Sequence, residues 1–356
     1  MSKFRAGVLY GQELIDVYED AKANGYALPG VNAVGTNTVN GILETAAKVA
    51  SPVIVQLSFG GGHFYAGKSL PNDNLQASAA GCLSAAHHVH QLAEMYGVPA
   101  ILHTDHCSLS NIAWIDHLLD YQEKYYEQFG RPLFSSHMLD LSEETLEENI
   151  EICEKYLARM SKIDVGLEIE LGITGGEEDG VDNSEVDSSK LYTHPHDVFY
   201  AYERLSKISS NFTVAAAFGN VHGVYKPGNV KLSVEILKNS QNYVADKIGR
   251  SGEKPVSFVF HGGSGSSEED ISLSIDYGVI KMNLDTDMQW AFSCGLRDYF
   301  AEYQDYVATQ IGNPDGDDLP NKKYYDPRKM LRKAEESFIA RLEKSFADLK
   351  CIGRNR

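Results

Sequence analysis

The chain lacks the features that would place it in a membrane or outside the cell. No apolar run approaches the length of a membrane span, and the N-terminus has neither a long apolar core nor a small-residue cleavage site. Its five cysteines are odd in number and widely spaced, with no C-x-x-C pair, which is typical of reduced thiols. The sequence therefore predicts a cytoplasmic protein with no membrane partner.

Positive charge is also scarce. The chain carries 32 Lys and Arg against 50 Asp and Glu, which gives a formal net charge of −18 at pH 7. Such a surface repels the phosphates of nucleic acids and anionic lipids, so we expect no nucleic-acid partner. A small anionic substrate would need a local nest of backbone donors or a few placed cations.

Short apolar runs recur along the chain, with helical patterns between them. The runs are rich in Val, Ile, Leu and Phe and do not alternate with polar residues, as expected for parallel strands covered on both faces. Eight strands are predicted, at Ala27–Asn32, Val53–Leu57, Ala100–Thr104, Leu133–Ser136, Val165–Leu171, Thr213–Phe218, Val256–Phe260 and Val279–Asn283.

Eight strands alternating with helices predict an α/β fold, a (β/α)8 TIM barrel with extra terminal helices. We expect one domain over residues 1–356, with a C-terminal helical extension from about residue 311. A doubly wound open sheet is the alternative. Among the helices, one is expected after a cap at Ser142 and the last at Lys329–Leu349, following a linker at Pro314–Arg328.

Three histidines each follow a different predicted strand. They are His106, His222 and His261, and Asp105 stands beside the first. The carboxyl ends of all barrel strands meet at one face, so these side chains should converge. Neutral imidazoles suit Zn²⁺, three protein ligands leave a position open for substrate, and the adjacent acid can move a proton. Cys107 could add a thiolate, although packing is its expected role.

Other polar residues near the strand ends extend this site. Asp140 and Glu170 follow or end the fourth and fifth strands and could hold a metal in a second position. Glu178 lies in the glycine-punctuated segment Gly172–Lys190, which is either a lid that carries a base or a solvated acidic loop. Lys281, near the end of the eighth strand, raises a rival chemistry, because a lysine can form a Schiff base.

Two further segments stand at the ends of the last two predicted strands. They read HGGSGS at residues 261–266 and KMNLDT at residues 281–286. Small residues let backbone N–H groups approach an anion, and a helix is expected to begin near Ser266 or Ser267. The loops after strands seven and eight are the usual phosphate site of a barrel, so we favour phosphate binding over plain tight turns.

Seven long motifs carry a family resemblance. They are LHTDHC (102–107), PLFSSHMLDLSEE (132–144), EIELGITGGEEDGV (168–181), FGNVHGVY (218–225), VFHGGSGS (259–266), KMNLDTD (281–287) and PNKKYYDPR (320–328). Together they resemble the class II, metal-dependent fructose-bisphosphate aldolases of the longer subgroup. The match covers essentially the whole chain.

This resemblance implies a metal-dependent aldehyde-lyase of glycolysis and gluconeogenesis. Its reaction would be the reversible cleavage of D-fructose 1,6-bisphosphate to dihydroxyacetone phosphate and D-glyceraldehyde 3-phosphate through a zinc-stabilised enediolate. The resemblance implies His106, His222 and His261 as ligands of the catalytic zinc. It implies Asp140 and Glu170 as a second metal position.

The same resemblance implies roles for the remaining residues. Asp105 and Glu178 match the catalytic acids. The positions that match the substrate site are Asn32, Ser58, Gly223, Gly262, Gly263, Ser264, Asn283, Leu284, Asp285, Thr286 and Arg328. Two of these glycines also match a site for a monovalent cation, Na⁺ or K⁺, and the arginine would reach its phosphate across a homodimer interface. The rivals are a tagatose 1,6-bisphosphate aldolase and a non-catalytic protein that binds metal and sugar phosphate.

Overall fold

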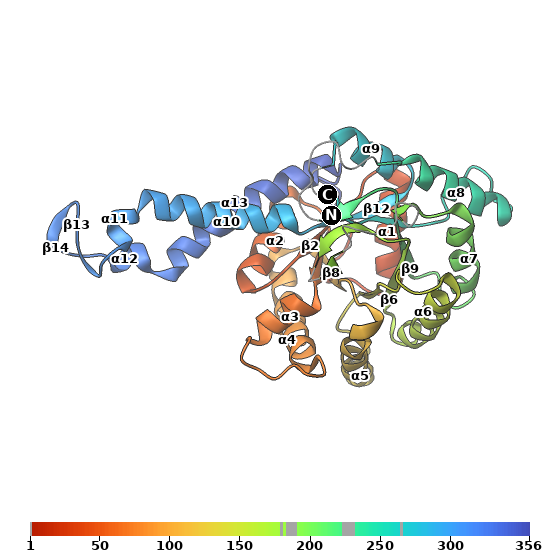
Figure 1. Ribbon diagram of the computed structural model, residues 1–356, viewed down its shortest axis with the longest axis horizontal. Coiled ribbons are helices and arrows are strands. Elements are labelled where there is room, and N and C mark those ends of the chain that lie inside the picture. Colours follow the sequence, from red (N-terminus) through yellow and green to blue (C-terminus); the bar gives the residue numbers. More distant parts are fainter. Residues whose placement is uncertain (1, 179–180, 183–190, 223–231, 264–265) are drawn as a thin grey trace.

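The computed structural model describes residues 2–178, 181–182, 191–222, 232–263 and 266–356, and for 176–178, 181–182 and 222 it describes the backbone alone. Eight parallel strands form a closed ring (Figure 1). In order round the ring they are β2 (Leu28–Asn32), β3 (Val53–Leu57), β4 (Pro99–Thr104), β5 (Ser136–Leu139), β6 (Gly166–Leu171), β9 (Phe212–Ala216), β11 (Phe258–Phe260) and β12 (Val279–Leu284).

The last strand pairs back with the first and closes the sheet. Lys281 of β12 lies opposite Leu28 of β2 in this register. Almost every residue of the eight strands is buried, because one face lines the barrel interior and the other is covered by helices. The predicted (β/α)8 barrel is confirmed, and the open sheet is excluded.

Helices surround this ring (Figure 1). They are α1 (Gln12–Asn24), α2 (Thr36–Val49), α3 (Phe59–Ala66), α4 (Gln76–Tyr96), α5 (Ile112–Phe129), α6 (Leu146–Met160), α7 (Pro195–Leu205), α8 (Glu235–Lys247) and α9 (Glu268–Asp276). The short strands β1 (Gly7–Val8), β7 (Gly175–Glu178), β8 (Val181–Asp182) and β10 (Val221–His222) lie outside the ring order. No helix in the described ranges is both long and apolar enough to cross a membrane.

Two predicted elements begin three residues later than expected. The fourth strand begins at Ser136 rather than Leu133, because the backbone N–H of Phe134 donates to the side chain of Gln122 (2.9 Å) and not to a neighbouring strand. The helix expected to start directly after a cap at Ser142 begins three residues later, at Leu146. Its cap is Thr145, whose hydroxyl accepts from the backbone N–H of Glu148 (3.3 Å) in a capping box.

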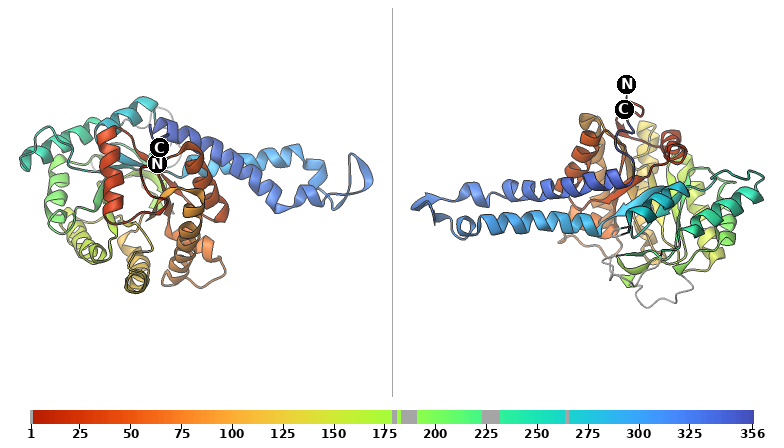
Figure 2. Two further views of the ribbon diagram at one scale, coloured as in Figure 1. Left: turned by 180° about the vertical axis from the view of Figure 1, so that it is seen from behind. Right: turned by 90° about the horizontal axis from the view of Figure 1, so that it is seen from above.

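The C-terminal part of the chain projects from the barrel as an arm (Figures 1 and 2). In the arm α10 (Thr286–Glu302) lies beside α13 (Pro327–Asp348). Its outer part contains α11 (Gln304–Val307), the antiparallel pair β13 (Ile311–Asn313) and β14 (Gly316–Pro320), and α12 (Lys322–Tyr325). The predicted linker is therefore largely ordered, and the projection starts within α10, before residue 311.

Close packing of α3 on α4 sets the position of one candidate site residue. A Cβ atom at Gly81 of α4 would lie 1.8 Å from the carbonyl oxygen of Gly62 in α3, so a side chain there would force the helices apart. Ser58 caps the start of α3, and its Oγ accepts from the backbone N–H of Gly61 (3.1 Å). The glycine contact therefore helps to hold Ser58 at the carboxyl end of β3.

We predict that Gly81→Ala lowers the free energy of unfolding by about 1–3 kcal/mol, the usual scale of overpacking. Ser84→Ala is the matched control, because it lies in the same helix on an exposed face. Urea unfolding of both variants would measure the difference. Equal stability of Gly81→Ala and the unmodified chain would show that the helices can separate without cost.

Candidate active site

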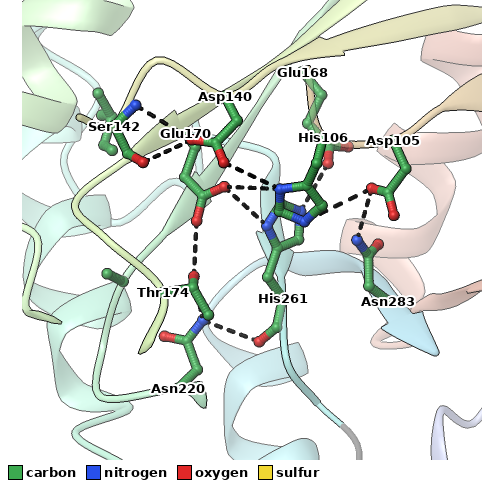
Figure 3. Close-up of polar contacts among 12 residues, drawn as sticks. Asp105, His106, Asp140, Ser142, Glu168, Glu170, Thr174, Asn220, His261 and Asn283 are labelled. Atoms are coloured by element: carbon green, nitrogen blue, oxygen red, sulfur yellow. Dashed lines mark hydrogen bonds and ion pairs between the residues drawn. The ribbon is translucent and has the colours of Figure 1, made fainter. Parts of the chain in front are cut away.

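The candidate site lies at the carboxyl ends of the strands, where the fold brings distant residues together (Figure 3). Asp105 and His106 follow β4, Asp140 follows β5, and Glu170 lies near the end of β6. His261 follows β11 directly. Parallel strands in a barrel direct these ends to one face, which is why residues far apart in sequence meet here.

Imidazoles and carboxylates form a compact group in this site. His106 Nδ1 lies 3.2 Å from Asp140 Oδ2, and His261 Nδ1 lies 3.2 Å from Glu170 Oε2. The two imidazole rings have their centroids 4.6 Å apart. Potential ligand atoms of His106, Asp140 and Glu170 all lie within 4.8 Å of one another, as do those of Asp105 with the two histidines.

The charges in this group favour a cation. Burial by itself would lower the pKa of His261, but Glu170 and Glu168 outweigh it and raise the pKa to about 9. Burial would raise the pKa of Asp140, but His106 and Ser142 lower it to about 2. Two imidazoles among buried carboxylates form a donor set that divalent metals accept, so the residues present fit such an ion.

The backbone at the first histidine is strained. His106 has φ of 25°, in a region that residues with a side chain rarely adopt. Such strain persists only where the surroundings hold it, and it is concentrated at functional sites.

Cys107, the residue after His106, is buried, and its Sγ donates to the carbonyl of Ser108 (3.6 Å), consistent with the expected packing role.

Three side-chain amides hold Asp105. Asn32 and Gln56 donate to its Oδ2 at 3.1 and 3.0 Å, and Asn283 donates to its Oδ1 at 3.1 Å. Gln56 also donates to Asn32, so two of the amides support each other. The carboxylate is buried and fixed in direction. Gln56 was not predicted as a site residue, because it stands within the apolar run of β3.

The comparisons with known proteins agree over the whole chain. The family model described as fructose-bisphosphate aldolase class-II matches residues 12–354. A fructose-bisphosphate aldolase of Campylobacter jejuni is 59% identical over 351 residues, which is 99% of this chain and 98% of that protein. The class 2 enzyme of Escherichia coli K12 is 59% identical, over 98% of this chain and 97% of its own length.

A solved structure agrees with these sequences. The crystal structure of the Campylobacter jejuni aldolase has a TM-score of 0.90 and 57% identity, over 99% of this chain and 98% of that chain. The chain belongs to the class II fructose-bisphosphate aldolase family. Members of this family are lyases that use a divalent metal, and the donor set described above fits that requirement.

Two residues expected from the resemblance to class II aldolases, Gly223 and Ser264, lie outside the described structure. For His222 and Glu178 the backbone alone is described: β10 pairs with β7, and His222 lies opposite Gly176. The backbone of the third expected histidine therefore lies beside the strand that carries the expected loop acid.

Five of the other expected substrate residues line two separate cavities. Asn32, Ser58 and Asp285 line a cavity of about 330 Å³. Gly263 and Leu284 line a second cavity, of about 360 Å³. Among the remaining residues, Gly262 adopts φ of 59°, Asn283 binds Asp105, and Thr286 begins α10.

Two basic residues were considered as groups that act on the substrate, and neither contacts the candidate metal ligands His106, Asp140 or Glu170 through a hydrogen bond in the described structure. Lys281, the Schiff-base candidate, donates to both oxygens of Glu168 at 2.8 Å and is fully buried. Burial would raise the pKa of Glu168, but Lys281 and the neighbouring histidines hold it well below its ordinary value.

Arg328 is the second residue of α13, which begins in the outer part of the arm, and its side chain is 88% exposed. Within one chain it is paired with Asp326 (2.6 Å), away from the site.

We predict that Gln56→Leu lowers kcat for aldol cleavage by about 10²-fold, the scale of a small misplacement of a catalytic group. The reason is that Asp105 loses one of its three amide donors. Gln122→Leu is the control, because that buried amide binds His137 and the backbone of Phe134 instead. Steady-state kinetics and thermal unfolding would be measured for both. An equal fall in kcat would assign the effect to general destabilisation.

Proposed function

We propose that the chain catalyses the reversible cleavage of D-fructose 1,6-bisphosphate to dihydroxyacetone phosphate and D-glyceraldehyde 3-phosphate, a step of glycolysis and gluconeogenesis. The observation that carries this proposal is the group of imidazoles and carboxylates at the strand ends, with Asp105 clamped beside it. The related enzymes are named as fructose-bisphosphate aldolases, which favours this substrate over tagatose 1,6-bisphosphate. The clamped acid also argues against a protein that only binds metal and sugar phosphate.

We further propose zinc as the divalent metal. His106 and His261 would hold it together with His222, and Asp140 and Glu170 would offer a second position. Bound there, the ion would supply a Lewis acid that polarises the ketone group of the sugar. Imidazole ligands with a free coordination position are the usual arrangement of catalytic zinc.

The chain's own residues would handle the protons and the phosphates. Asp105, fixed by its amides, would hold the proton at the oxygen that becomes the aldehyde, and Glu178 would exchange the proton on the dihydroxyacetone-phosphate carbon. Backbone N–H groups of the loops at Gly262–Ser264 and Asp285–Thr286 would bind one phosphate, near the N-terminus of α10. Carbonyl groups at Gly223 and Gly262 could hold a Na⁺ or K⁺ ion.

The arm supports a homodimer. It exposes large apolar side chains, including Trp290, Phe300, Ile311 and Leu319, whose exposed fractions are 66%, 44%, 63% and 44%. A second copy of the chain would cover such a surface and receive Arg328 at its site. We propose a single catalytic domain, residues 1–356, extended by this arm, in a cytoplasmic enzyme.

We predict that removing the metal with a chelator abolishes activity and that zinc or cobalt restores it, because the ketone then loses and regains its Lewis acid. Metal content and aldol cleavage would be measured on the same samples. Full activity after verified metal loss would contradict the proposal. Inactivation by borohydride in the presence of substrate would instead assign the chemistry to Lys281.

We predict that Arg328→Ala raises KM for fructose 1,6-bisphosphate and slows cleavage, because a planar guanidinium binds phosphate bidentately. Exchange of the dihydroxyacetone-phosphate proton should remain nearly intact. Lys329→Ala, the next residue on α13, is the control.

Mixing Arg328→Ala with Asp105→Ala tests whether the arginine acts across an interface. Hybrid dimers should regain activity, because one of their sites then contains both residues intact. No recovery despite demonstrated subunit exchange would place Arg328 in the site of its own subunit.

A further inference from the structure

A buried ion pair lies beneath the candidate metal site. Lys281 of β12 and Glu168 of β6 have side chains that are only 1% and 2% exposed, and the ammonium donates to both carboxylate oxygens at 2.8 Å. The two strands are not neighbours in the ring, since β6 pairs with β5 and β9 and β12 pairs with β11 and β2. The pair therefore spans the barrel interior.

The local structure makes room for this pair. A Cβ atom at Gly30 of β2 would lie 2.9 Å from Cε of Lys281 and 2.6 Å from Oε1 of Gln56. A buried ion pair is a poor source of stability, because the cost of removing both charges from water is comparable with their attraction. Apolar residues would fill the same space, so the pair calls for another explanation.

That explanation lies in the contact of Glu168 with a candidate ligand. Glu168 Oε1 lies 3.0 Å from Nε2 of His261, whereas Nδ1 of the same ring faces Glu170 Oε2 at 3.2 Å. Lys281 keeps Glu168 in place as a hydrogen-bond acceptor, so Nε2 must carry the hydrogen and donate it. A metal that binds His261 would then take the place of the proton on Nδ1, which faces the other candidate ligands. A ligand histidine commonly donates its second N–H to a carboxylate in this way.

We propose that Lys281 and Glu168 are a positioning pair that fixes the orientation and tautomer of His261 and thereby sets the affinity of the site for its divalent metal. The proposal rests on the metal-dependent function proposed above. Neither residue touches the substrate in this scheme, and each acts through the histidine. The same pair gives Lys281 a role that requires no Schiff base.

The competing interpretation of Glu168 is that it binds a second metal ion in the barrel interior. Ligand atoms of His103, Asp105 and Glu168 also lie within 4.8 Å of one another. The ammonium of Lys281 already lies against Glu168, however, and His103 Nδ1 is 2.8 Å from the hydroxyl of Ser136. An added cation would face the Lys281 charge at close range, so the geometry favours the ion pair.

Two double variants separate positioning from charge balance. Glu168→Gln with Lys281→Met removes both charges but keeps an oxygen that can accept from His261. Glu168→Leu with Lys281→Met also removes both charges and leaves no acceptor. The dissociation constants for Zn²⁺ and Co²⁺ would be measured by chelator competition, and the visible spectrum of the Co²⁺ form would report on ligand geometry.

We expect the leucine variant to bind both metals about 10–100-fold more weakly, the usual effect of losing an outer-shell partner. The glutamine variant should stay near the unmodified chain in affinity and spectrum. His137→Gln is the control, because this buried histidine contacts Thr104 and Gln122 instead, and it should change stability without changing metal affinity. Native affinity and spectrum in the leucine variant would overturn the proposal.

A second experiment uses the unmodified chain, so its result does not depend on whether any variant folds. With ¹⁵N-labelled histidine and bound ¹¹³Cd²⁺, scalar coupling identifies the nitrogen that binds the metal, and we expect Nδ1 for His261. Coupling to Nε2 would overturn the proposal. Failure of the unmodified chain to bind any divalent metal would instead contradict the proposed function, so the two failures are distinguishable.

Discussion

The burial of three carboxylates inside the barrel is the constraint that organises this molecule. Asp105, Glu168 and Glu170 are each at most 2% exposed. An unpaired carboxylate at such a position would be prohibitively costly, so each must have donors. The partners differ: neutral amides for Asp105, an ammonium for Glu168, and a hydroxyl and imidazoles for Glu170.

These partners give chemically similar groups different roles. Amide donors fix the direction of Asp105 without adding a charge, which suits a group that handles a proton. An ammonium neutralises Glu168 within the protein and leaves it as a fixed acceptor. The imidazoles beside Glu170 can exchange a proton for a metal ion, so the positive charge at that end can come from outside the chain. A chain of net charge −18 can thus present a locally positive site to an anionic substrate.

The sequence supports some of these conclusions and not others, for physical reasons. The strand-end positions of His106 and His261 are local features, because each follows a continuous apolar run. The pair Lys281 and Glu168 is separated by 113 residues, and periodicity carries no information about which strands face each other across a ring. Gln56 was missed for a related reason. Gln56 is one polar residue within an apolar run, and the run does not indicate its partner. Its role follows from the structure, in which its amide donates to Asp105.

The two-residue period of the strands places the Lys281–Glu168 ion pair directly beneath the residues of the candidate active site. Side chains two residues apart point to the same face, so the interior forms layers. Lys281 and Asn283 are one such step on β12, and Glu168 and Glu170 are the same step on β6. In each strand the deeper residue belongs to the ion pair, and the outer residue contacts Asp105 or His261. Gly30 is the deeper position of β2 beneath Asn32, and only a residue without a side chain leaves space there for Lys281. The outer layer can therefore hold its geometry because the deeper layer is filled by paired charges rather than by side chains that could repack.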